Sequence, residues 1–244
     1  MKFCLALIAA LLPLNFLRIL FYRTFLNYKI SFSSKIGLFN IIISDKCFIN
    51  NATIKNFNFI EVSNIQIDSN AEIRYFNRFS RLNKIHLKTQ SLISRNNDFI
   101  GTRNGISPFK DFENFTLGQN SYILKHNIID LSDSITIGNN VVLGGIGSQL
   151  WTHGFDNKRN KVQGPIKIGN NVYIGSSSMI MSSVNICDET IIGSGTVISK
   201  NIFEKGFYVS NELIQKKTNF AQKNKLIEFK GKMFLRKDNE NNKS

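Results

Sequence analysis

The 244-residue sequence has few of the residues that cross-link or interrupt a chain. Its three cysteines, Cys4, Cys47 and Cys187, are far apart and form no Cys-x-x-Cys pair, so we expect neither a disulfide framework nor a zinc site. A reducing compartment is the simpler assumption. Only three prolines and sixteen glycines are present, which argues against a long disordered region.

Acidic residues are also scarce. The chain has 17 Asp and Glu against 31 Lys and Arg, which gives a formal net charge of +14. This balance favours anionic partners, unless it reflects only a general bias toward Lys and Asn. No RNA-binding motif, zinc-finger spacing or helix-turn-helix pattern is present, so we do not expect nucleic acid as a partner.

The chain opens on the apolar stretch "FCLALIAALLPLNFLRILFYRTF". Its uncharged run, 3–17, is shorter than the ~20 residues that a membrane span needs. Polar residues recur at helical spacing and form one narrow stripe: Asn15, Arg18 and Tyr22. We interpret 1–30 as an uncleaved amphipathic helix that contacts a membrane through 3–23. A helix that caps the end of the fold and a signal peptide are the alternatives.

A period of six residues dominates the second half of the chain. One set of isoleucines shows it most clearly: Ile168, Ile174, Ile180, Ile186, Ile192 and Ile198. A helix turns by 100° per residue and would scatter these side chains, whereas an extended chain points all of them the same way. Weaker runs of the same period lie at 36–60, 67–85, 117–129 and 137–143. The pattern predicts an all-β solenoid in which stacked turns bury one another.

The segments "ITIGNNVVLGG", "IKIGNNVYIGSSSMI" and "IIGSGTVISKNI" resemble the hexapeptide-repeat acyltransferases, and among them the sugar O-acetyltransferases of surface-polysaccharide biosynthesis. The resemblance implies a left-handed parallel β-helix over 31–210, interrupted by a loop at 144–165. It also implies acetyl-CoA as acyl donor and a homotrimer. A basic C-terminal extension, 211–244, follows the domain.

The period fails after Leu143 and resumes at Ile166 or Ile168, and the interruption carries "WTH". The resemblance implies that His153 is the general base, because an enzyme must remove the proton of a hydroxyl acceptor. Histidine as a residue type suits this role, because the unperturbed imidazole titrates near pH 6.5 and its neutral form can accept a proton at neutral pH. Trp151 either stacks on a sugar or the cofactor, or anchors the loop. Asp156 is a candidate for orienting the imidazole, or is a solvated loop acid.

The resemblance also assigns binding residues. Acetyl-CoA contacts are carried over to five positions: Tyr173, Ser176, Ser194, Ser199 and Lys200. Asn127 is an acceptor contact or a polar residue on a coil face. The family's Gly-x-Pro-Ala motif is absent here, which removes support for further cofactor contacts at Lys216 and Lys217. The three histidines, His86, His126 and His153, lack the paired spacing of zinc carbonic anhydrases, so we expect no metal.

We therefore expect an acetyltransferase that moves acetyl from acetyl-CoA to a sugar hydroxyl of a glycan or lipid-linked glycan precursor. It would be cytoplasmic, at the inner face of the cytoplasmic membrane. N-acetylation of a nucleotide-linked amino sugar is one alternative. A non-catalytic β-helix scaffold is the other.

Overall fold

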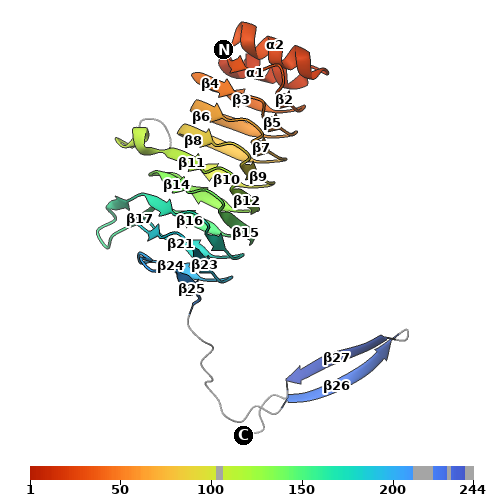
Figure 1. Ribbon diagram of the computed structural model, residues 1–244, viewed down its shortest axis with the longest axis vertical. Coiled ribbons are helices and arrows are strands. Elements are labelled where there is room, and N and C mark those ends of the chain that lie inside the picture. Colours follow the sequence, from red (N-terminus) through yellow and green to blue (C-terminus); the bar gives the residue numbers. More distant parts are fainter. Residues whose placement is uncertain (103–106, 211–221, 230–231, 240–244) are drawn as a thin grey trace. The chain divides into compact units, whose positions relative to one another are not determined.

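The computed structural model describes residues 1–102, 107–210, 222–229 and 232–239. The chain divides into two compact units, Met1–Ser210 and Asn211–Ser244. The described part of the second unit is an antiparallel pair of strands, β26 (Gln222–Phe229) and β27 (Lys232–Asn239). In the first unit, parallel strands wind into a β-solenoid of about nine turns, here called coils (Figure 1). The predicted parallel β-helix is confirmed.

The solenoid has three faces. Face 1 contains β1 (Lys29–Ile30), β4 (Lys46–Ile49), the second halves of β6 (Phe59–Ile67) and β8 (Arg78–Leu87), β11 (Asn114–Leu117), β14 (Ile135–Ile137), β19 (Ile166–Ile168) and β22 (Asn185–Ile186). Face 2 contains β3 (Ile41–Ile43), the first halves of β6 and β8, β10 (Asp98–Ile100), β13 (Ile128–Asp130), β16 (Gln149–Trp151), β21 (Met179–Ile180) and β24 (Val197–Ile198). Face 3 contains β2 (Lys35–Ile36), β5 (Thr53–Ile54), β7 (Glu72–Ile73), β9 (Leu92–Ile93), β12 (Tyr122–Lys125), β15 (Val142–Ile146), β20 (Tyr173–Ile174), β23 (Thr190–Ile192) and β25 (Gly206–Tyr208).

The isoleucines of the six-residue period point into the solenoid. Ile174, Ile180 and Ile192 are fully buried, because each is covered by the coils before and after its own. Burying one such side chain stabilises the fold by about 1.5–3 kcal/mol. In the middle coils, aromatic rings fill the same inward positions, and the rings of Phe79 and Phe99 stack with centroids 4.4 Å apart. The period read from the sequence is therefore the period of the core.

A ladder of buried asparagines runs along the edge between faces 3 and 2, which we call the Asn edge. Its members are Asn40, Asn58, Asn77, Asn97 and Asn127. The Oδ1 of each accepts the backbone N–H of the next at 2.9–3.0 Å, and Asn127 accepts from the N–H of Ser148. The ladder satisfies the polar backbone that the turns bury at this edge.

Two helices, α1 (Lys2–Leu11) and α2 (Asn15–Phe25), lie at the N-terminal end of the solenoid (Figure 1). The sequence predicted one helix here. Pro13 separates the two, because proline lacks the N–H that continues a helix. The described part of the chain contains no helix that is both long and apolar enough to span a bilayer.

The polar stripe of α2 faces inward, toward the first coil. Arg18 Nε donates to the carbonyl of Ile36 at 2.8 Å, and Tyr22 Oη donates to the carbonyl of Asn40 at 2.9 Å. Asn15 Oδ1 accepts the N–H of Ile36 at 2.8 Å. These side chains form hydrogen bonds with backbone groups of the first coil that have no neighbouring strand to pair with. The segment thus covers the end of the solenoid, as the alternative interpretation of it as a cap expects.

We expect Asn77→Ala to destabilise the fold, because it leaves the buried N–H of Asn97 without its acceptor. A buried polar group left without a hydrogen-bond partner lowers the free energy of unfolding by about 1–3 kcal/mol. Asn50→Ala is the control, since Asn50 is exposed and outside the ladder. Chemical denaturation measures both free energies of unfolding. Equal losses in the two variants would contradict the structural role of the ladder.

Candidate active site

A β-hairpin leaves the solenoid at the edge between faces 2 and 1, which we call the loop edge (Figure 1). It consists of β17 (His153–Phe155) and β18 (Lys161–Gln163), paired antiparallel. The predicted loop, 144–165, starts later in the structure, because β15 (Val142–Ile146) and β16 (Gln149–Trp151) still belong to the solenoid. A bulge between β12 and β15 adds one residue there, so the inward positions Leu143 and Leu150 are seven apart and the period of six is hidden.

The imidazole of His153 is held by a buried carboxylate. His153 Nδ1 lies 2.8 Å from Asp130 Oδ2, and the side chain of Asp130 is 9% exposed. The backbone N–H of Thr152 also donates to Asp130 Oδ2, at 3.1 Å, and Ser132 Oγ donates to Asp130 Oδ1 at 3.1 Å. A carboxylate at Nδ1 favours the tautomer with its proton on Nδ1. The lone pair of Nε2 is then free, and Nε2 bonds to no described residue.

Sequence reasoning missed Asp130 and considered Asp156 instead. Asp156 accepts the backbone N–H groups of Lys158 and Asn160 at 2.8 Å, and the hydrogen bonds to Asn160 lower the pKa of its carboxyl. It therefore holds the turn of the hairpin. Asp130 lies one coil before His153, on the strand that pairs with β16. An alignment of successive coils that matches the inward residues Ile129 and Leu150 would have placed Asp130 next to the segment that carries His153.

Two aromatic rings lie near the imidazole. The ring of His153 is nearly perpendicular to that of Phe155, at 5.7 Å between centroids, and the ring of Trp151 lies at 6.4 Å. Trp151 Nε1 donates to Gln149 Oε1 at 2.9 Å, which fixes the indole over face 2. Phe155 is 67% exposed. Both rings therefore present apolar surface close to His153.

Asn127 is not at this surface. It is 1% exposed, and its amide belongs to the asparagine ladder. The structure gives it a structural role, so we do not retain it as an acceptor contact. The other two histidines lie elsewhere: His86 pairs with Asp68 at 2.8 Å, and His126 contacts Asn96 at 3.3 Å.

The structure does not gather the five predicted cofactor residues at one place. Tyr173 is half exposed on face 3. Ser176 and Ser194 lie on the Asn edge in successive coils, where a Cβ on Gly175 would approach Ser194. Ser199 and Lys200 are exposed on the loop edge, two coils beyond His153. Lys216 and Lys217 lie outside the described residues.

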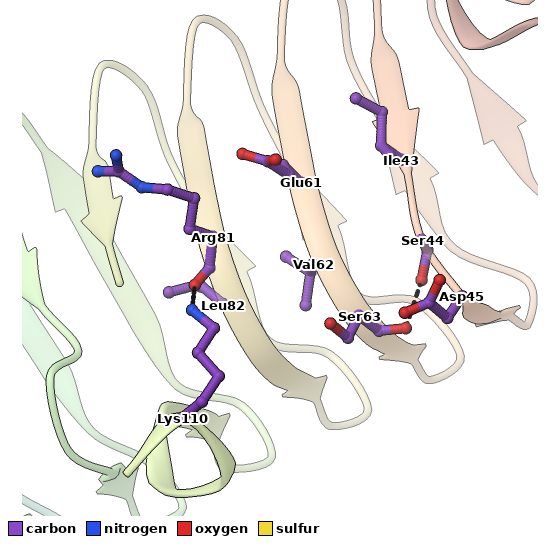
Figure 2. A pocket seen from close by; sticks show the side chains of 9 residues that line it. All are labelled: Ile43, Ser44, Asp45, Glu61, Val62, Ser63, Arg81, Leu82 and Lys110. Atoms are coloured by element: carbon purple, nitrogen blue, oxygen red, sulfur yellow. Dashed lines mark hydrogen bonds between the residues drawn. The ribbon is translucent and has the colours of Figure 1, made fainter. Parts of the chain in front are cut away.

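A hollow of about 150 Å³ lies on the same loop edge, farther toward the N-terminus than His153. Figure 2 shows its lining: Ile43, Ser44, Asp45, Glu61, Val62, Ser63, Arg81, Leu82 and Lys110. Lys110, on the short helix η1 (Lys110–Phe112), donates to the carbonyl of Arg81 and binds the buried carboxylate of Glu113. The insertion that carries η1 leaves the same edge between this hollow and His153, so the two are separate. Across the described ranges, His, Cys, Asp and Glu form no group suited to a metal ion.

Gly145 has a backbone conformation that disfavours any side chain. Its φ is +64°, and a Cβ there would lie 1.5 Å from Ser176 Oγ. We expect Gly145→Ala to lower stability by about 1–2 kcal/mol from the backbone alone. Gly154→Ala is the matched control, because its Cβ would meet no atom within 4 Å. Thermal unfolding measures both, and equal stability would contradict the close approach of the two coils.

Comparisons with known proteins match this chain in its repeat. The family model described as bacterial transferase hexapeptide (six repeats) matches residues 165–200. The chain is 31% identical over 124 residues to the galactoside O-acetyltransferase of Escherichia coli (strain K12), covering 47% of this chain and 61% of that protein. It is 29% identical over 154 residues to the bifunctional protein GlmU of Wolbachia pipientis wMel, covering 63% and 30%.

A crystal structure of a maltose O-acetyltransferase from Clostridium difficile 630 matches with 24% identity and a TM-score of 0.42, covering 57% of this chain and 71% of that chain. The chain spans less than two thirds of the length of both curated relatives. The resemblance found in the sequence is nevertheless confirmed: residues 165–200 carry the hexapeptide repeat of the bacterial transferases.

Proposed function

We propose that this protein is an acetyltransferase that moves acetyl from acetyl-CoA to a sugar hydroxyl of a glycan or lipid-linked glycan precursor. One observation carries the proposal: His153 Nδ1 is bound to the buried Asp130, which leaves Nε2 open at the loop edge. Hydrogen bonding of this kind keeps an imidazole in the tautomer and orientation that a general base needs.

In the proposed reaction, Nε2 of His153 accepts the proton of the acceptor hydroxyl as its oxygen attacks the thioester carbonyl. The carbon–sulfur bond then breaks, the acetyl ester forms, and the proton passes from the imidazolium to the departing thiolate. Asp130 stabilises the imidazolium while it exists. Positioned general-base catalysis contributes roughly 10²–10⁴-fold.

Two small-residue positions and one cation remain the proposed contacts for acetyl-CoA. The small side chains of Ser176 and Ser194 would let an extended chain approach the backbone of the coils, and Lys200, on the loop edge, would offer a point charge for phosphate. His153 lies on a different edge of the prism from these two serines. A homotrimer would explain the separation, with the loop edge of one subunit beside the Asn edge of its neighbour. The relative named galactoside O-acetyltransferase supports an O-acetyl transfer.

We expect His153→Ala to lower kcat by about 10²–10⁴-fold without changing the unfolding midpoint, because the base is lost and the core is untouched. Asp130→Asn should also lower kcat, since it no longer favours the proton on Nδ1. His126→Asn is the control, because asparagine tolerates the positive φ of 58° at that position. Release of CoA thiol measures turnover. Unchanged turnover in His153→Ala would remove the proposed base.

Two further questions need separate tests: whether the acceptor is a hydroxyl or an amine, and whether the protein is an enzyme or a scaffold. Turnover with otherwise identical hydroxyl and amine acceptors distinguishes O-acetylation from N-acetylation. Calorimetry with acetyl-CoA distinguishes both from a non-catalytic scaffold, which would not bind it.

We also propose that residues 3–23 bring the protein to the inner face of the cytoplasmic membrane. The inward polar stripe leaves large apolar side chains of the two helices outside, each 41–61% exposed: Phe3, Leu7, Ile8, Leu11, Leu14, Phe16, Leu20 and Phe25. Four exposed cations lie near them in the chain, Lys2, Arg23, Lys29 and Lys35, and Lys2 pairs with Asp45 at 2.6 Å. An apolar surface with cations beside it suits an anionic lipid surface.

We expect Leu14→Glu/Phe16→Glu to reduce binding to anionic phospholipid vesicles several-fold, because it places two charges in the apolar surface. Phe203→Glu/Phe207→Glu is the control: these side chains are 79% and 68% exposed, in the last coils of the solenoid. Co-sedimentation measures the bound fraction. Equal binding of both double variants would rule out the helices as the contact.

A further inference from the structure

Three phenylalanines on the Asn edge occupy an unfavourable backbone conformation. Phe39, Phe57 and Phe76 have φ values of 58°, 65° and 58°, where a bulky residue is a genuine outlier. Their rings stack with 5.0 Å between successive centroids and remain 44–57% exposed. The next coils place Asn96 and His126 at the same position. The turn therefore accepts polar residues, and the exposed phenyl ladder needs another explanation.

The phenyl ladder begins at the helical cap. The backbone N–H of Phe39 donates to the carbonyl of Ala10 near the end of α1, at 2.9 Å. From there the rings lead away from the exposed apolar side chains of the helices, one ring per coil. Exposed apolar patches of this kind mark binding surfaces more often than isolated apolar residues do.

Three cationic side chains lie on the Asn edge beyond the last ring of the phenyl ladder. Arg74, Arg95 and Lys125 come from three successive coils and line a cavity of about 430 Å³ together with Tyr75, Ser94, Leu124 and Gly145. Neighbouring strands in a sheet are about 4.8 Å apart, so the three cations repel one another. Arg74 Nε lies 3.4 Å from Glu72 Oε1, while Arg95 and Lys125 form no ion pair with any described residue. An anion in the cavity would relieve this repulsion.

The cavity extends to Gly145, in the bulge of β15. The next strand in the chain, β16, leads from this bulge to His153. Gly145 lines the cavity and has no side chain to obstruct a ligand. From the bulge, β16 crosses face 2 to the loop edge, and a strand of three residues is about 10 Å long. Trp151 lies at the far end of β16, one residue before Thr152 and His153.

We propose that the Asn edge binds a lipid-linked phosphate or diphosphate. Its hydrocarbon chain lies along the phenyl ladder from the cap, its phosphoryl groups bind Arg74, Arg95 and Lys125, and a sugar beyond them extends over β16 toward His153. A nucleotide-linked sugar or CoA would use the cations but leaves the phenyl ladder without a ligand. The fate of the sugar rests on the proposed acetyl transfer, whereas binding of the lipid phosphate does not.

Calorimetry on the full-length protein tests the site with three probes: farnesyl diphosphate, inorganic pyrophosphate and farnesol. We expect farnesyl diphosphate to bind at least tenfold more tightly than either of the others. Arg95→Gln/Lys125→Gln should lower the affinity for farnesyl diphosphate and for pyrophosphate at least tenfold. Phe57→Asn/Phe76→Asn should weaken only farnesyl diphosphate, and asparagine suits the positive φ. Lys46→Gln/Lys84→Gln, which removes two cations lining a different cavity, is the control.

Equal affinity for farnesyl diphosphate and pyrophosphate, or equal affinity of the wild type and both double variants for farnesyl diphosphate, would overturn the proposal. So would a tenfold loss of acetyl-CoA binding in Arg95→Gln/Lys125→Gln, because the cations would then serve the donor. Selective farnesyl diphosphate binding without acetyl transfer would refute the proposed function and leave this site standing. Acetyl transfer without selective binding of farnesyl diphosphate would support the proposed function and refute this site.

Discussion

Every part of this protein depends on the hydrogen bonding and packing of each coil against the next. A two- or three-residue strand such as β20 buries little by itself, and its inward Ile174 is shielded only by the coils on either side. The same stacking gives every edge a fixed spacing. A residue type that recurs at one position of successive coils becomes a continuous column, as the buried asparagines and the exposed phenylalanines do.

The candidate site exists because the stacking is interrupted at one edge. The hairpin leaves after Trp151, and His153 stands at its first position. The adjacent coil supplies Asp130, whose buried carboxylate receives the imidazole. Two residues 23 apart in sequence are thus brought into contact by the pairing of β13 with β16. The rigidity of this pairing is what allows a loop histidine to have a defined orientation.

The terminal helices reverse the usual arrangement of an amphipathic helix on a soluble protein. Asn15, Arg18 and Tyr22 face the solenoid because the first coil exposes carbonyl and N–H groups that no preceding coil can pair with, and these polar side chains satisfy them. The apolar residues are left outside as a consequence. Capping and membrane contact are therefore compatible uses of one segment. The phenyl ladder starts at the same end, which joins the cap to the edge that we propose for a lipid phosphate.

The sequence by itself determined the solenoid, because a period of six fits only an extended chain that points each isoleucine inward. It also determined that "WTH" stands at a break in that period. It did not reveal where the break begins, since the extra residue at Gly144 and Gly145 hides the period. Only the tertiary structure decided the partner of His153, the burial of Asn127 and the inward direction of the polar stripe. Each of these depends on which residues of neighbouring coils lie opposite one another, and a single insertion shifts that register by a whole position.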